Sequence, residues 1–364
     1  WQKVMVRGEL DILKAIVPLL LTATVLLSNS AKSDGLTAQD YAEKGLKSAT
    51  FFPGLASLCD ISREPRNMFQ SGVSKDTRPE RRAADTPSLT EQRKASKGNT
   101  NRRARRHIPP QKVFDNLYYV GAGNVASWAI DTGKTIVLVD ALNSDEQAEK
   151  YIFAGLKTLG LEDKPVSHLI ISHGHGDHYG GFNAVVKRFN PRIVMSELEW
   201  ELLEHDSFAS RRWGAKPKKD MAVNDGDTLN IDGTMLTFHV TPGHTPGTLS
   251  LVFPVYDGDE PHRAVLWGGT GLNYGSDVQR IQSYTESAQI MKGYVEAQNI
   301  DVFLSNHPGR DGSREKLLAS RLDNAAEKHA FVQGKNIVKE AFEFLENCTR
   351  AQWMNIVENK SKGS

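Results

Sequence analysis

The pattern of apolar and polar positions predicts alternating strands and helices after residue 113. Runs of β-branched and aromatic residues indicate strands, and apolar residues at helical spacing indicate helices. The expected strands are 114–120, 126–130, 135–140, 166–172, 192–195, 235–240, 248–254, 263–267 and 301–305, and the expected helices are 144–159, a segment ending near 189, 197–205, 283–298 and 314–357. In the last helix, an apolar face that would cover a core contains Leu317, Leu318, Leu322 and Ala325.

The N-terminal segment 1–31 has the pattern of a signal peptide. An apolar run at 15–27 follows basic residues and precedes small ones. It is too short for a membrane span of ~20 residues, and Pro18 argues against the alternative of a buried helix. We therefore expect a secreted or periplasmic protein. An oxidising compartment would suit a disulfide between Cys59 and Cys348, although their spacing alone does not establish one.

Residues 32–110 form an N-terminal extension whose section 62–107 differs in charge from the rest. That section holds 13 basic and 5 acidic residues, whereas the whole chain has a net charge of +1. Few of its residues are apolar, so we expect a disordered or loosely draped linker that is dispensable for chemistry. The alternative is binding of nucleic acid or an anionic surface through the arginines of 102–106. That cluster contains no aromatic residue to stack on bases, so no nucleic-acid partner is expected.

Residues that could bind a metal are most concentrated in the run His173-Gly174-His175-Gly176-Asp177-His178. Three imidazoles and a carboxylate within six positions suit zinc. The run lies between the expected strand 166–172 and a helix, at the kind of edge where layered α/β proteins bind ligands. We expect Gly174 and Gly176 to leave room for two metals held by alternate residues. The alternative is a solvated loop.

Two further turns carry a histidine after a strand. His244 lies in Thr-Pro-Gly-His-Thr-Pro-Gly at 241–247, and His307 lies in Ser-Asn-His-Pro at 305–308. Either histidine alone is more typical of a hydrogen-bonded structural residue. The repeated order of strand, sharp turn and histidine favours a ligand role for both.

These three motifs together resemble the metallo-β-lactamase superfamily over about residues 111–320. The resemblance implies an α/β (α+β) fold, an αββα sandwich with a binuclear metal site at one edge, followed by a helical cover at 321–364. It implies two Zn²⁺ per chain and a catalytic role for Asp177 and His178. One zinc would be held by His173, His175 and His244, and the other by Asp177, His178 and His307.

One absence narrows the branch of the superfamily. Lactonases and glyoxalase II carry a bridging aspartate between the fourth and last histidines, and other binuclear β-lactamases carry a cysteine there. Residues 264–273 contain neither. The nearby carboxylates Asp257, Asp259 and Asp277 have turn-like or polar surroundings and are not expected to bridge. The ligand set therefore resembles the third subclass of class B β-lactamases, in which Thr270 and Asn273 would meet a substrate carboxylate.

The resemblance implies a zinc hydrolase that opens the β-lactam ring by attack of a metal-bound hydroxide. A small-molecule substrate and no stable membrane span are expected, and the oligomeric state stays open. One alternative is a lactonase or another amide or ester metallohydrolase. A nucleic-acid enzyme or binder is a further alternative, but the 62 residues between His244 and His307 leave no room for an inserted domain.

Overall fold

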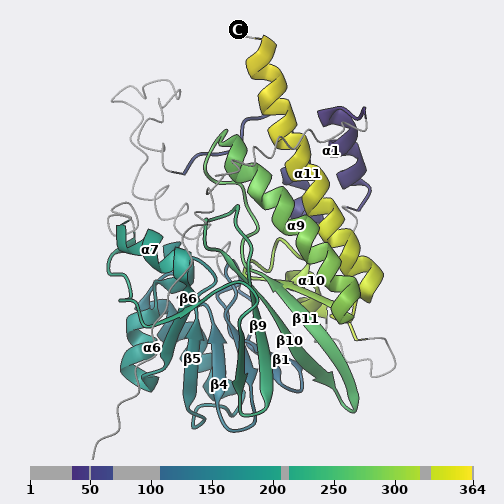
Figure 1. The fold of residues 1–364 in the computed structure, drawn as a ribbon. Coiled ribbons are helices and arrows are strands. Elements are labelled where there is room, and N and C mark those ends of the chain that lie inside the picture. The colour runs from purple at the N-terminus through teal and green to yellow at the C-terminus, as the bar shows by residue number, and fades with distance from the viewer. Residues whose placement is uncertain (1–34, 49–50, 69–106, 206–212, 320–328, 363–364) are drawn as a thin grey trace, which may run out of the picture. The chain divides into compact units, whose positions relative to one another are not determined.

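The computed structural model describes residues 35–48, 51–68, 107–205, 213–319 and 329–362 (Figure 1). From Leu36 onward the chain forms one compact unit. The apolar run at 15–27 and the arginines of 102–106 lie outside the described residues, so both expectations remain predictions. Within the described ranges, no helix combines the length and apolar character needed to cross a bilayer.

Twelve strands of the described chain make two sheets. In the first sheet the spatial order follows the sequence, and pairing changes from antiparallel to parallel after β4. Its strands are β1 (Gln111–Phe114), β2 (Leu117–Tyr119), β3 (Trp128–Asp131), β4 (Ile136–Val139), β5 (Val166–Ile170), β6 (Arg192–Ser196) and β7 (Met221–Val223). The second sheet has the order β12-β11-β10-β9-β8, and only β11 and β12 run parallel. Its strands are β8 (Thr228–Ile231), β9 (Thr234–Val240), β10 (Leu249–Asp257), β11 (Glu260–Trp267) and β12 (Val302–Ser305).

Helices cover the outer face of each sheet, as Figure 1 shows. On the side of β4–β6 lie α3 (Asp145–Gln147), η2 (Ala148–Phe153), α4 (Ala154–Thr158), α5 (Gly176–Tyr179), α6 (Phe182–Phe189) and α7 (Glu197–His205). On the side of β10–β12 lie α1 (Ala38–Leu46), η1 (Pro53–Cys59), α9 (Val278–Gln298) and α11 (Lys335–Lys362), and the short α10 (Ser313–Ala319) follows β12. The expected helix 144–159 is therefore one helical stretch with a π-helical centre, η2.

Three buried clusters correspond to the three interfaces of an αββα sandwich. The inner faces of the two sheets meet around Trp128, Phe238 and Phe253. The outer face of the first sheet packs on helices through residues such as Leu169 and Trp200. The third cluster joins the second sheet to α9 and α11. The expected sandwich is confirmed.

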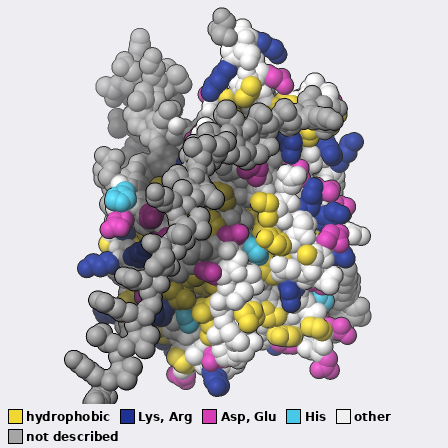
Figure 2. Space-filling model, viewed as in Figure 1, with side chains coloured by type: hydrophobic (Ala, Val, Ile, Leu, Met, Phe, Trp, Pro, Cys, Tyr) yellow, Lys and Arg dark blue, Asp and Glu magenta, His cyan; other side chains and the backbone are white. Residues whose placement is uncertain are grey.

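Ion pairs join the helices that cover the second sheet, but they are not the main source of its stability. Figure 2 shows basic and acidic side chains interspersed on this face. Lys292 of α9 pairs with Glu346 of α11 at 2.7 Å, and Lys339 pairs with Glu296 at 3.4 Å. The Lys339–Glu296 pair is exposed, and such a pair contributes about 0–1 kcal/mol, whereas the Lys292–Glu346 pair is partly buried. The cover is held mainly by burial of apolar side chains such as Phe342.

Two of the expected elements are divided in the structure. Residues 114–120 are not one strand, because β1 and β2 form a hairpin whose turn residue Asn116 donates from Nδ2 to the Pro254 carbonyl. The helix expected at 314–357 is split into α10 and α11 by the non-helical residues 329–334. Leu317 is fully buried whereas Leu318 is 40% exposed, because adjacent helical positions point about 100° apart. Leu322 and Ala325 lie outside the described residues.

The described part of the N-terminal extension before residue 69 packs on the C-terminal helix α11. A disulfide joins Cys59 to Cys348, with their Cα atoms 4.4 Å apart. Gln352 of α11 donates from Nε2 to the carbonyls of Leu58 and Asp60 at 3.0 and 2.9 Å. Residues 62–68 continue this packed segment, so the expected linker at 62–107 begins too early. Its buried member Met68 donates its backbone N–H to the Asn273 carbonyl at 2.7 Å.

We expect the Cys59→Ser, Cys348→Ser double variant to lose about 2–4 kcal/mol of unfolding free energy, because the bridge restricts a long loop in the unfolded chain. Urea unfolding followed by tryptophan fluorescence measures the change. The wild type in reductant is the matched control and should unfold like the variant. Equal midpoints for the oxidised and reduced wild type would show that the bridge does not stabilise the fold.

Candidate metal centre

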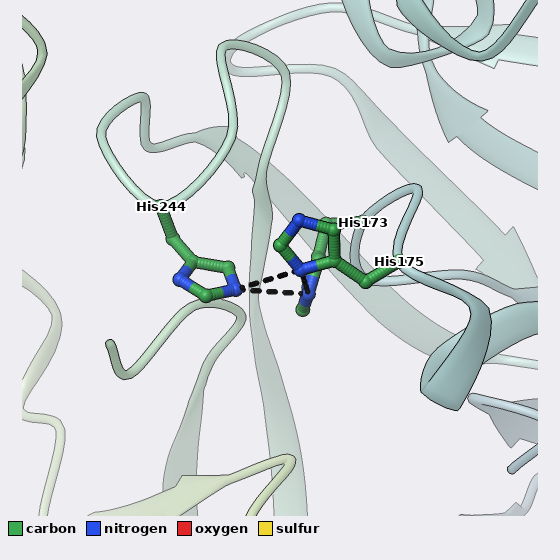
Figure 3. Close-up of side chains that lie close together, drawn as sticks. All are labelled: His173, His175 and His244. Atoms are coloured by element: carbon green, nitrogen blue, oxygen red, sulfur yellow. Dashed lines mark hydrogen bonds between the residues drawn. The ribbon is translucent and has the colours of Figure 1, made fainter. Parts of the chain in front are cut away.

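Turns at one edge of the sandwich place all six predicted ligands. Residues 173–178 follow β5 and lead into α5, whose first helical residue is Gly176. His244 lies in the turn between β9 and β10, and His307 follows β12. Figure 3 shows His173 and His175 of one loop and His244 of another directed toward a common point.

The first group consists of three buried imidazoles. The inward nitrogens of His173 and His175 are 3.0 Å apart, and His244 Nε2 lies 3.1 Å from each of them. Nitrogens about 2.0 Å from a tetrahedral zinc would be separated by ~3.3 Å, so the triangle fits such an ion. All three side chains are buried, His175 being the most exposed at 7%.

The second group adjoins the first and is more open. Asp177 Oδ2 lies 3.5 Å from His178 Nε2 and 3.9 Å from His307 Nε2. His178 is fully buried, whereas the side chains of Asp177 and His307 are 30% and 25% exposed. In each group the ligand atoms lie within 4.8 Å of one another. The structure thus brings together the six residues in the two sets expected from the sequence.

Hydrogen bonds on the far side of the rings show that both groups suit a cation. His173 and His244 donate from Nδ1 to the carbonyls of Gly268 and Gly271, at 2.9 and 2.6 Å, so the Nε2 lone pairs of these two histidines face each other. One proton from His175 can satisfy only one of those lone pairs. The buried Nε2 of His178 has no hydrogen-bond partner. The rings of His173, His178 and His244 each donate an N–H away from the centre and leave the lone pair of the other nitrogen facing inward. This is the arrangement of histidines that bind a metal.

Burial adjusts the protonation of the first group for metal binding. It lowers the pKa of His173 and His244 well below the ordinary range for imidazole, and it lowers the pKa of His175 to about 3. Neighbouring histidines lower the pKa of His173 further. These imidazoles are therefore neutral at physiological pH, which is the form that binds metal.

In the second group, neighbouring charges outweigh burial in setting the pKa values of Asp177 and His178. Burial lowers the pKa of His178, but the charges of Asp177 and Asp140 outweigh it and the net shift is upward. Burial raises the pKa of Asp177, yet the charges of His178 and His307 bring it to about 2. Asp177 is thus ionised, and a metal at this group competes with a proton on His178.

Asp140 positions His178 and was not predicted as a site residue. Its Oδ2 accepts from His178 Nδ1 at 2.7 Å, and its Oδ1 accepts from the Ser172 backbone N–H at 2.8 Å. The residue is fully buried and has a φ of 66°. Left-handed backbone at a non-glycine residue is unfavourable, and such strain is frequent at functional sites. The sequence showed only an aspartate at the end of an expected strand.

Glu199 of α7 joins the two loops that carry the first group. Its Oε1 accepts from the Gly174 N–H at 2.6 Å, and its Oε2 accepts from the Gly247 N–H at 2.9 Å and from Thr245 Oγ1 at 2.8 Å. Burial raises the pKa of this carboxyl, whereas the three donors favour the ionised form. It was not predicted because nothing in α7 indicated that one of its several glutamates faces inward.

The structure gives a different reason for the two glycines of the histidine motif. A Cβ at Gly174 would lie 2.9 Å from Glu199 Oε1, and a Cβ at Gly176 would overlap the Trp213 side chain. The expectation that these glycines make room for the metals is therefore wrong. They allow a supporting carboxylate and a pocket wall to approach the loop.

A cleft opens beside the two groups and has two lobes, of about 480 and 220 Å³. Thr270 and Asn273 line it, and their expected contact with a substrate carboxylate remains a prediction. Arg66 and Met68 also line it, so the expected linker is not remote from the chemistry. Asp177 is the one carboxylate among the described residues that line these lobes.

The three nearby carboxylates do not reach the cleft. Asp257 and Asp259 lie at the hairpin between β10 and β11. Asp277 caps α9 by accepting from the Arg280 N–H. None lines either lobe, as the sequence led us to expect.

Residues 120–258 match the family described as the metallo-beta-lactamase superfamily. The chain is 25% identical to the solved structure of BJP-1, a subclass B3 metallo-beta-lactamase of Bradyrhizobium japonicum. The match covers 71% of this chain and 94% of that one, with a TM-score of 0.53.

Curated relatives with other activities also match. The hydroxyacylglutathione hydrolase of Rhodopseudomonas palustris is 30% identical over 33% of this chain and 40% of the relative. The N-acyl homoserine lactonase of a Bacillus species is 33% identical over 27% of this chain and 36% of the relative. The chain spans about half the length of the curated relatives it matches.

Proposed function

We propose that this chain, whose residues 120–258 match the metallo-beta-lactamase superfamily, is a metallohydrolase of that fold. We propose further that it holds two Zn²⁺ and opens the β-lactam ring. The observation that carries the proposal is the ligand set of five histidines and one aspartate. The stretch 264–273, where the resemblance would place a bridging carboxylate or thiolate, contains neither and includes Gly268 and Gly269. A side chain at Gly269 would collide with His244.

Zinc bound by these residues would supply Lewis acidity toward a carbonyl oxygen and lower the pKa of a water toward ~7. The chain's own residues fix the ligand rings and orient the water and the substrate. Nδ1 hydrogen bonds fix the rings of His173, His244 and His307, the last of which donates to the Asn124 carbonyl at 3.0 Å. Ionised Asp177 presents an acceptor oxygen in the cleft that orients a water proton. Thr270 and Asn273 offer hydrogen bonds to a polar substituent of the substrate.

Hydrolysis of a lactone or thioester is the second candidate. Similarity to two relatives named as a lactonase and a hydroxyacylglutathione hydrolase supports it. All these reactions need an attacked carbonyl and a stabilised leaving group, and the ligand groups serve each of them. The missing second carboxylate favours the β-lactam over these substrates.

We expect zinc-loaded protein to hydrolyse at least one of a penicillin, a chromogenic cephalosporin and a carbapenem. Dipicolinate should remove the activity and added zinc should restore it. Clavulanate should have no effect, because no serine is acylated. Absorbance assays measure the rates, with a homoserine lactone and an aryl thioester as parallel substrates. Cleavage of the lactone or thioester alone would replace the β-lactam reading by the second candidate.

We also propose that the protein is exported. The apolar run at 15–27 and the disulfide between Cys59 and Cys348 support this, since such bonds persist in oxidising compartments. Alkylation of protein taken directly from cells tests the idea. Two freely reactive thiols in the native protein would contradict it.

A further inference from the structure

The two lobes of the cleft share residues of both ligand groups but differ in the rest of their lining. Asp177, His244 and His307 border both lobes, together with Arg66 and Asn273. A substrate whose reacting bond lies over the shared residues would therefore extend into both lobes. The chemical character of each lobe then indicates what the substrate carries at each end.

The larger lobe is basic. Arg66, Arg310 and Arg314 line it, and among its described lining residues the only carboxylate is Asp177. Asp177 faces the imidazoles of His178 and His307. The remaining polar side chains of the lobe are neutral. Arginine is well suited to bind carboxylates through paired N–H donors, and a concave basic surface concentrates anions.

The arginines are carried by a wall with defined contacts. Arg310 donates from Nη1 to the Gly54 carbonyl and to Ser57 Oγ, both at 3.1 Å, which joins the loop after β12 to the N-terminal segment. The Arg66 carbonyl accepts from the Gly275 N–H at 3.1 Å. Its neighbour Asn67 forms a β-bridge with Tyr274. The backbone of Arg66 is thus held in place while its side chain is exposed to the cleft.

The smaller lobe has an apolar wall beside the same ligands. Met68 and Trp213 line it. The Trp213 ring centroid lies 5.6 Å from that of His175, and the same ring packs over Gly176. An aromatic ring and a thioether favour an apolar substituent.

From these two linings we propose that the preferred substrate carries a carboxylate, bound in the lobe of Arg66, Arg310 and Arg314, and an apolar group, bound against Met68 and Trp213. The proposal rests on the chain's being a hydrolase at this centre. It does not depend on whether the bond cleaved belongs to a lactam, an ester or a thioester.

The test uses two esters of similar length that differ in one charge. These are the neutral 4-nitrophenyl hexanoate and the mono-4-nitrophenyl ester of adipic acid. We expect a higher kcat/KM for the acid ester, and an Arg66→Ala loss of about tenfold on that ester alone, as for a charge-assisted hydrogen bond of ~1.4 kcal/mol. Arg66→Lys should recover part of the loss. The preference should also weaken with added salt.

Arg63→Ala is the matched control. Arg63 belongs to the same segment, its side chain is 84% exposed, and it does not line either lobe. It should leave both rates unchanged. Equal kcat/KM values for the two esters in wild type, or equal losses on both esters in Arg66→Ala, would overturn the proposal.

Calorimetric titration with adipate separates this proposal from the proposed function. Wild-type zinc protein should bind adipate about tenfold more tightly than Arg66→Ala does. Adipate binding that depends on Arg66 without hydrolysis of any ester or lactam would sustain the carboxylate subsite and contradict the hydrolase. Hydrolysis with adipate binding unaffected by Arg66→Ala would do the reverse.

Discussion

His244→Ala is expected to reduce hydrolysis on the order of a thousandfold and to empty the first metal group, because three imidazoles form that group and two cannot hold the ion tightly. His307→Ala should empty only the second group and leave about one metal per chain. Elemental analysis of dialysed protein measures both contents. The proton competition at His178 makes the second group the weaker one as the pH falls, so acidic dialysis of the wild type should remove its metal first.

His262→Ala is a suitable control for both variants. His262 pairs with Asp301 at 2.6 Å and lines neither lobe of the cleft. It should retain metal content and turnover. A His307→Ala protein with two metals and full activity would show that the fifth histidine is not a ligand.

Glu199→Ala is expected to weaken zinc binding by about 10–100-fold, the usual effect of losing a residue that orients ligands. The substitution leaves the buried N–H groups of Gly174 and Gly247 without their acceptor, and a buried unsatisfied donor costs about 1–3 kcal/mol. The two ligand loops would then no longer be tied to one helix. Competition with a fluorescent chelator measures the zinc affinity directly.

Glu201→Ala is the matched control, since Glu201 lies on the same helix and is exposed. Glu199→Gln keeps the size of the side chain and one oxygen, so it should fall between wild type and alanine. Thermal unfolding with excess chelator separates loss of fold from loss of metal. If Glu199→Ala bound zinc as tightly as Glu201→Ala, the carboxylate would have no role in positioning the ligands.

The candidate ligands stand out in the sequence because they lie in turns that follow strands, and the family resemblance divided them into two sets. Local pattern sets these features: an apolar run ends, and glycine or proline allows the chain to turn. The strands β5 and β12 and the turn after β9 were therefore expected close to where they occur. The hairpin at Asn116 was not predicted, because Asn116 is held by a hydrogen bond to the Pro254 carbonyl, which is far away in the sequence.

The residues that support the ligands could not be predicted either, because their partners are distant in the sequence. Glu199 accepts from Gly174 and Gly247, which lie 25 and 48 positions away in sequence. Composition alone suggested that residues 62–107 stay apart from the core, yet Met68 is buried against Asn273. A basic, polar stretch can still be ordered locally where a few of its residues meet a preformed surface. The short strands β7 and β8 carried too few apolar positions to be recognised.

The docking of the N-terminal segment has a consequence for the order of events in folding. All six ligands lie between residues 173 and 307, whereas Gln352 and Cys348 of α11 meet Leu58 and Cys59 only by closing a loop of almost 300 residues. Contacts of such sequence separation form slowly because loop closure costs entropy before any contact repays it. The metal centre can thus assemble while the wall that carries Arg66 is still undocked. A newly made chain would bind its metal before the wall that carries Arg66 can select among substrates.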